Sequence, residues 1–182
     1  MGAADPEATY GREHMEPLER ALSQHPFLAG LDRRYVRQLG SLASYQSFPA
    51  HQVIFDEGQP ANEFYLICKG KVALETAVLG CESIVIQALG PGEVLGWSWL
   101  LPPYEWHYSS RAAGPTDVVV LDGKALRARC EEDHDLGYEM MKRFALVIVQ
   151  RLAATRARLL HYPDPKPADE GPDLAAFRAM VE

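Results

Sequence analysis

Cysteine is scarce in this sequence, and no two cysteines are spaced for a shared role. The three thiols, Cys68, Cys81 and Cys130, include no C-x-x-C pair. An odd number of well-separated cysteines argues against both a disulfide framework and a zinc ribbon. We therefore interpret them as ordinary thiols in a reducing compartment.

Long apolar runs are also missing. The longest strictly apolar run, Phe144 to Val149, is far shorter than the roughly 20 residues that a membrane-spanning helix needs. Residues 1–15 contain acidic side chains and no apolar stretch, so they do not resemble a secretory signal. We expect a cytoplasmic protein without membrane contact.

Positive charge is in deficit. The chain has 18 Lys and Arg against 25 Asp and Glu, a formal net charge of −7. Nonspecific affinity for nucleic acids depends on Lys and Arg that neutralise phosphates. Direct binding to DNA is therefore not expected.

The sequence does not place His, Ser or acidic residues at the spacings that catalysis or a metal site would need. The six histidines are too far apart for the H-x-H pair of a metal-dependent jelly-roll enzyme. Ser109 and Ser110 stand near His107, but neighbours on a strand face opposite ways and nothing orients the imidazole. We predict no catalytic residue, no metal ligand and no enzymatic activity.

The centre of the chain has the texture of an all-β block. Hydrophobic residues make up 47% of the sequence, and short runs rich in Val, Ile, Leu, Phe and Tyr alternate with turn residues. Eight strands are predicted, at residues 45–48, 53–55, 64–67, 72–77, 83–89, 94–95, 108–112 and 118–121. Short strands at this spacing predict a sandwich, barrel or jelly roll.

Helical patterns flank the β block. Two short helices precede it, the second capped by Asp32, and a helix over residues 124–131 follows it. A long helix is predicted over residues 134–161, with Asp133 as its cap and an apolar stripe at spacings of three and four. The stripe contains Leu136, Met140, Phe144, Ile148, Leu152, Thr155 and Leu159.

The stripe is longer than a β block of this size can cover. We therefore predict a homodimer in which Met140, Phe144, Ile148 and Leu152 form the seam. The alternative is a helix packed wholly on its own domain. We expect a flexible segment at residues 1–15, one domain at 16–162, and a proline-rich tail at 163–182 that ends in a short helix.

Three spaced motifs carry a resemblance to a known family. They are His25-Pro26-Phe27-Leu28-Ala29-Gly30-Leu31, the stretch from Gly58 to Val72 that includes Phe64-Tyr65-Leu66-Ile67, and Pro91-Gly92-Glu93-Val94-Leu95-Gly96. Together with the order of elements, they resemble the cyclic nucleotide-binding domain of the catabolite-activator and FNR type. The resemblance covers roughly residues 25–162. It implies an eight-stranded jelly-roll barrel, mainly β with flanking helices, followed by a long C-terminal helix that makes a dimer.

Two charged contacts that the resemblance implies are replaced here. In members that bind cyclic nucleotides, an acid after the last glycine of Gly-Glu-x-x-Gly bonds the ribose, and an arginine further on pairs with the phosphate. Those positions hold Trp97 and Trp106 in this sequence. Arg111, five residues after Trp106 on the predicted strand, is an alternative partner for the phosphate, but we interpret it as a structural residue of its strand. The family's helix-turn-helix has no counterpart in the 20 residues after Tyr162.

Aromatic residues crowd the same segment. Trp97, Trp99, Trp106, Tyr104 and Tyr108 all lie between positions 97 and 108. The cluster fits a plug that fills a vestigial pocket, a remodelled pocket for a small planar or apolar ligand, or an exposed patch for a protein partner. The plug is the interpretation we favour.

These observations predict a non-enzymatic regulatory or sensor module of the cyclic nucleotide-binding fold with an altered phosphate-binding cassette. No cofactor is assigned, and a cyclic nucleotide is disfavoured. The alternatives are a scaffold dimer with a filled pocket and a cyclic nucleotide receptor with a non-standard site. The predicted ligand cassette contains Gly92, Glu93, Val94, Leu95, Gly96, Trp97, Ser98, Trp106, His107, Tyr108 and Arg111.

Overall fold

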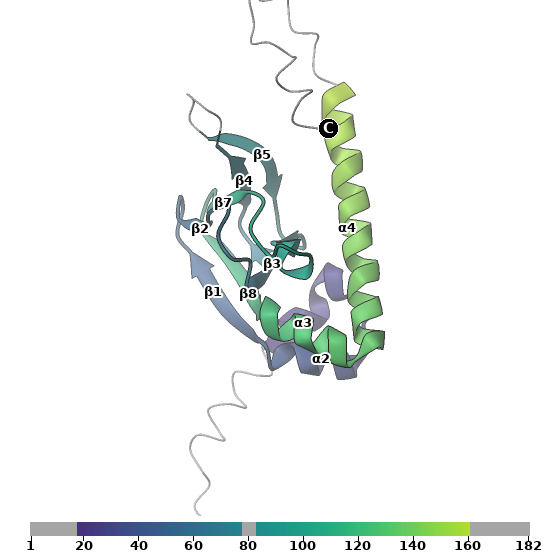
Figure 1. The fold of residues 1–182 in the computed structure, drawn as a ribbon. Coiled ribbons are helices and arrows are strands. Elements are labelled where there is room, and N and C mark those ends of the chain that lie inside the picture. The colour runs from purple at the N-terminus through teal and green to yellow at the C-terminus, as the bar shows by residue number, and fades with distance from the viewer. Residues whose placement is uncertain (1–17, 78–82, 161–182) are drawn as a thin grey trace, which may run out of the picture. The chain divides into compact units, whose positions relative to one another are not determined.

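The computed structural model describes residues 18–77 and 83–160. Eight strands lie between short helices and one long helix (Figure 1). After a helical stretch at residues 18–24, the elements are η1 (Pro26–Leu28), α2 (Arg33–Gly40), β1 (Ala43–Phe48), β2 (Val53–Phe55), β3 (Glu63–Lys69), β4 (Val72–Thr76), β5 (Ile84–Leu89), β6 (Val94–Leu95), η2 (Trp97–Leu100), β7 (Ser109–Ala112), β8 (Thr116–Asp122), α3 (Gly123–Glu132) and α4 (His134–Leu160).

The strands form two antiparallel sheets of four. Their orders are β1-β8-β3-β6 and β2-β7-β4-β5, so strands far apart in sequence become neighbours. The turn between β3 and β4 requires Gly70, because its φ is +86° and a Cβ there would lie 2.3 Å from the carbonyl oxygen of Pro115. This arrangement confirms the predicted eight-stranded fold class.

Strand β3 separates two aromatic clusters. Its residues Phe64 and Tyr65 are each 1% exposed, and successive side chains on a strand face opposite sides. Phe64 contacts Phe27, Trp99 and Phe144 on the helical side. Tyr65 lies in the barrel interior, near Phe48, Phe55 and Trp106. The helices therefore cover one face of β3, and the second sheet covers the other.

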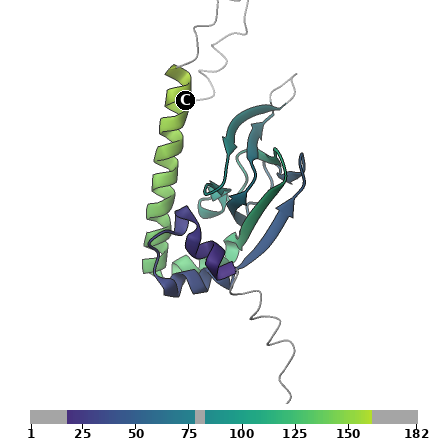
Figure 2. The ribbon, with the colours of Figure 1, turned by 180° about the vertical axis from the view of Figure 1, so that it is seen from behind.

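The short helices close one end of the sheets, as Figure 1 shows for α2 and α3. Asp32 caps α2 by accepting a hydrogen bond from the Arg34 N–H at 2.8 Å, as predicted. Figure 2 shows the N-terminal helical segment beside the first turns of α4. There the Arg143 guanidinium donates to the Ala29 carbonyl at 3.0 Å, and Phe27 packs on Phe144. These contacts tie the helices into the same core as β3.

Helix α4 begins where predicted, with Asp133 accepting hydrogen bonds from the N–H groups of Asp135 and Leu136 at 3.1 Å each. The chain divides into two compact units after Phe144, within this helix. In the first unit, Met140 and Phe144 are at most 1% exposed and pack on their own chain. In the second, Ile148 and Leu152 are 43% and 69% exposed.

The predicted elements differ from the structure mainly at their ends. Strand β7 begins at Ser109 rather than at 108, and β8 extends from Thr116 to Asp122 because its pairing with β1 and β3 continues beyond the apolar run. Residues 78–82, between the predicted strands at 72–77 and 83–89, and both terminal segments lie outside the described residues.

Candidate functional site

The cassette extends from the turn before β6, through β6, to β7, and its first part forms a closed turn. Gly92 has a φ of +83° and lies against the Pro26 ring. The Glu93 carboxylate accepts a hydrogen bond from the Gly90 N–H at 2.7 Å. Val94 and Leu95 are buried in the core. Glu93 therefore holds the turn together, and the next two residues anchor it.

Gly96 brings the backbone against an indole ring. Its φ is +81°, and a Cβ at this position would lie 2.7 Å from Cζ3 and 2.8 Å from Cη2 of Trp106. Both the backbone conformation and the space therefore require glycine.

Trp106 fills the barrel interior next to Gly96. It is 5% exposed, and its ring stacks on Phe55 with the centroids 3.9 Å apart and the planes 14° apart. The Tyr65 ring lies 6.4 Å away. The backbone of Trp106 is fixed on both sides, since its N–H donates to the Gln59 carbonyl at 2.9 Å and its carbonyl accepts from the Gly58 N–H at 2.8 Å. These backbone hydrogen bonds therefore hold Trp106 in a position from which its indole lies in the barrel interior.

The interior around Trp106 contains the hydroxyls of Ser110 and Tyr65, and the Tyr65 hydroxyl donates to the Glu63 carboxylate. Ser110 is 1% exposed, and its Oγ has no hydrogen-bond partner in the described part of the chain. Burial raises the pKa of the Tyr65 phenol, and the neighbouring Glu63 carboxylate adds to the effect. Among the described residues, Glu75 and Arg143 are the buried members of the Asp, Glu, Lys and Arg types. Neither faces Trp106, because Glu75 pairs with Arg111 and Arg143 with Glu139.

Other predicted cassette residues gather on the outside. The Ser98 hydroxyl lies 2.9 Å from Nδ1 of His107, and the Trp97 ring stacks on the His107 imidazole at 5.7 Å. Ser98 is buried, His107 is exposed, and Tyr108 is 41% exposed. Trp97 thus contacts His107 at the surface, whereas Trp106 lies inside.

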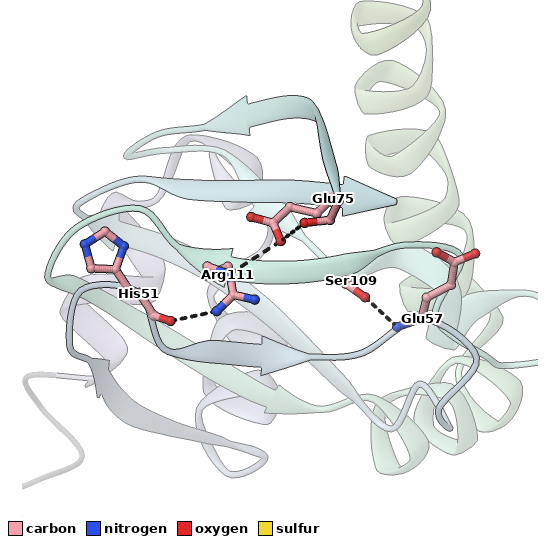
Figure 3. A network of polar contacts seen from close by, with 6 residues as sticks. His51, Glu57, Glu75, Ser109 and Arg111 are labelled. Atoms are coloured by element: carbon pink, nitrogen blue, oxygen red, sulfur yellow. Dashed lines mark hydrogen bonds and ion pairs between the residues drawn. The ribbon is translucent and has the colours of Figure 1, made fainter. Parts of the chain in front are cut away.

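Arg111 lies on the other face of β7 from Ser110. Its Nε is 3.4 Å from a Glu75 carboxylate oxygen, and its Nη1 donates to the His51 carbonyl at 2.9 Å (Figure 3). In the same view, the Ser109 hydroxyl accepts from the Glu57 N–H at 3.0 Å. Because adjacent residues on a strand face opposite ways, the guanidinium and the Ser110 hydroxyl lie on different faces of the sheet.

Several residues that shape the cassette are not among the predicted site residues. Phe55 and Tyr65 supply the aromatic walls, and Arg127 binds the cassette from α3. Its guanidinium donates to the Trp99 carbonyl at 2.6 Å and lies 3.9 Å from the Tyr104 ring centroid. The pairing of β2 with β7 in a jelly roll, with the correct strand register, would have predicted that Phe55 lies across from Ser110. Nothing in the sequence indicated the Arg127 contacts.

Two further properties bear on chemistry. Burial raises the pKa of the Cys68 thiol, and it raises that of Cys130 to about 11, so neither forms a thiolate readily at neutral pH. The described residues contain no cluster of three His, Cys, Asp or Glu side chains that could hold a metal ion. Within residues 18–77 and 83–160, no helix is long and apolar enough to cross a membrane.

Two four-stranded antiparallel sheets with short helices at one end and a long helix after them define a jelly roll of the cyclic nucleotide-binding type. Residues 45–133 match the family described as the cyclic nucleotide-binding domain. This part of the chain therefore belongs to that family.

The relatives are regulators. The chain is 30% identical over 139 residues to the cyclic AMP receptor protein of Thermus thermophilus, a match that covers 76% of this chain and 59% of the relative. It is 20% identical to a CRP-like cAMP-activated global transcriptional regulator of Mycobacterium tuberculosis, covering 78% and 62%. The chain thus spans about three fifths of the length of these relatives.

A solved structure from Geobacter metallireducens, a putative cyclic nucleotide-binding protein, is similar over almost its whole length. It shares 29% identity with a TM-score of 0.66, and the match covers 75% of this chain and 96% of that one.

Proposed function

We propose that this domain is a non-enzymatic regulatory module whose phosphate-binding cassette is filled by its own Trp106 and does not bind cyclic nucleotides in the family's usual way. The observation that carries the proposal is the buried Trp106 ring, stacked on Phe55 and pressed against Gly96. Two free thiols, Cys68 and Cys130, suit a cytoplasmic site of action.

Electrostatics supports the same conclusion. A cyclic phosphate in a sheltered site needs a cation, and the nearest guanidinium by sequence, Arg111, is held by Glu75 and the His51 carbonyl. Removing one partner of a buried ion pair costs about 2–5 kcal/mol, which is roughly thirtyfold to several thousandfold in affinity. Use of Arg111 would also require it to reach the other face of β7. A receptor with a non-standard site is therefore disfavoured.

Calorimetric titration with cyclic AMP and cyclic GMP tests the proposal directly. We expect no binding with a Kd below about 10 μM, which corresponds to roughly 7 kcal/mol. The Thermus thermophilus cyclic AMP receptor protein is a suitable positive control. Tighter binding to this chain would overturn the proposal, because it would require a charge partner inside the barrel.

A second function, self-association as a scaffold, rests on a different observation. The second compact unit exposes an apolar surface on α4, where Leu146, Ile148, Val149 and Leu152 are between 43% and 69% exposed. A contiguous exposed apolar surface is typical of an interaction site. We propose that α4 forms a homodimer through these residues, and that the module acts through this dimer or a protein partner rather than by reading DNA.

A further inference from the structure

The Ser110 hydroxyl is a buried polar group that the proposed function leaves unexplained. It is 1% exposed, and its Oγ is unpaired among the described residues. Buried side-chain polar atoms in folded proteins nearly always have a hydrogen-bond partner, and an exception calls for an explanation. Ser110 lies on β7 directly across from Phe55 on β2, so the hydroxyl stands beside the ring on which Trp106 stacks.

The residues around the Ser110 hydroxyl determine which kind of ligand could form a hydrogen bond with it. Phe55 offers an aromatic face, and the Tyr65 ring lies at a tilt beside it with its hydroxyl already donating to the Glu63 carboxylate. The buried charges at Glu75 and Arg143 pair elsewhere. An anion or cation would lose its hydration here without compensation. A neutral planar ring would keep the stacking contact, and an N–H or O–H on that ring would give Ser110 its partner.

We propose that the barrel interior is a binding site for a small neutral heteroaromatic molecule with one N–H or O–H group, and that Trp106 is its resident intramolecular competitor. This inference rests on the proposed function, because it assumes a site that does not take a charged nucleotide. The indole of Trp106 occupies the stacking position, and its anchored backbone keeps it there.

The competition has a measurable consequence. A group tethered on the same chain acts at an effective concentration in the millimolar range or above. A free ring therefore binds the wild type weakly, since it must first displace Trp106. Removing the competitor increases the apparent affinity by the reciprocal of the fraction of time that the indole leaves the site open.

The experiment uses indole as the probe and indene as the matched ligand without an N–H. Calorimetry and thermal shift are measured on the wild-type chain, Trp106→Ala, and the control Trp97→Ala, which removes a tryptophan that stacks on His107 at the surface. We expect Trp106→Ala to bind indole at least tenfold more tightly than the wild type or Trp97→Ala. If Trp106→Ala does not fold, Trp106→Leu is compared in the same way.

The hydrogen bond is tested by adding Ser110→Ala. In the Trp106→Ala background we expect indole to bind about fivefold more tightly than indene, the usual worth of one hydrogen bond, and Ser110→Ala to abolish that preference. Equal indole affinity in Trp106→Ala and Trp97→Ala would overturn the site. An indole preference that survives Ser110→Ala would overturn the assigned ligand class.

The outcomes also separate this inference from the function on which it rests. Cyclic AMP is titrated into the same wild-type sample. Tight binding of cyclic AMP would contradict the proposed function, whatever indole does. Failure of indole to bind Trp106→Ala, with no cyclic AMP binding by the wild type, would contradict only the aromatic site.

Discussion

Trp106 and Gly96 are a matched pair at the scale of single residues. The indole needs the volume that a side chain at position 96 would take, and the φ of +81° at that position disfavours any residue with a Cβ. Stacking on Phe55 then makes the ring part of the barrel core. The result is a cassette whose interior contact is aromatic rather than charged.

Replacing Trp106 with Ala should leave a cavity, because the ring is 5% exposed and packed on Phe55. Truncation of a buried aromatic residue costs about 3–5 kcal/mol in the free energy of unfolding. Trp97→Ala, which removes a half-buried ring from His107, should cost far less. Urea unfolding of both variants measures the difference. Similar losses in the two would mean that Trp106 is not a core residue.

Replacing Gly96 with Ala should also destabilise the domain. The positive φ alone costs about 1–2 kcal/mol for a residue with a Cβ, and the 2.7 Å approach to Trp106 adds overlap. Gly114→Ala is the matched control, since its Cβ would meet nothing within 4 Å. We expect a lower melting temperature for Gly96→Ala than for Gly114→Ala. If both variants melt alike, the close contact with Trp106 is not rigid.

At the scale of elements, Asp133 joins three helices. It follows α3, caps α4 through the N–H groups of Asp135 and Leu136, and accepts a hydrogen bond from the Tyr35 hydroxyl of α2 at 3.3 Å. The Leu136 N–H is the main cause that lowers the pKa of the Asp133 carboxyl below its usual range. The charged form is therefore favoured in the folded protein.

This lowered pKa predicts the pH dependence of one contribution to stability. The contribution is fully present above the pKa that Asp133 has in the unfolded chain, and it is lost as the pH falls through the lower folded pKa. Asp133→Asn keeps the size but not the charge. We expect Asp133→Asn to melt below the wild type at neutral pH, with the difference shrinking towards about pH 3. A difference in melting temperature that is constant with pH would show that the charge of Asp133 contributes nothing.

The β elements were predictable because each strand is a short run of β-favouring residues between turn residues, as at β2 and β6, whose bounds match the sequence expectation. The sequence predicted helix α4, but it did not predict which part of the apolar stripe is buried in the same chain. Met140 and Phe144 share their spacing with Ile148 and Leu152, yet the first pair is buried in its own chain and the second is exposed. The spacing of apolar residues identifies an apolar face of a helix, but it does not show what that face packs against.

At the scale of the whole molecule, the proposed homodimer depends on the exposed part of α4. We expect Ile148→Glu with Leu152→Glu to convert a homodimer to a monomer in sedimentation at tens of micromolar, because two charges would be buried in the seam. Gln150→Glu with Ala154→Glu is the control. It adds the same charges at the same spacing, with each charge about 200° around the helix from Ile148 or Leu152.

Dissociation by the control as strongly as by the test variant would point to general charge repulsion rather than a seam. A monomeric wild type at these concentrations would contradict the dimer altogether.

The strands, the flanking helices and the caps at Asp32 and Asp133 were predictable from the sequence alone. All of these follow from local pattern or from spacing along the chain. Local signals report what a residue can do on its own strand or turn.

The directions in which the aromatic residues of the cassette point depend on tertiary contacts. Trp106 enters the barrel, Trp99 joins the helical core with Phe64 and Phe144, and Trp97 stays outside on His107. Arg111 is likewise held outside by Glu75, a residue 36 positions away. The reason is physical: each of these contacts joins segments brought together by strand pairing, and no local preference encodes which face of a distant strand will meet a given ring.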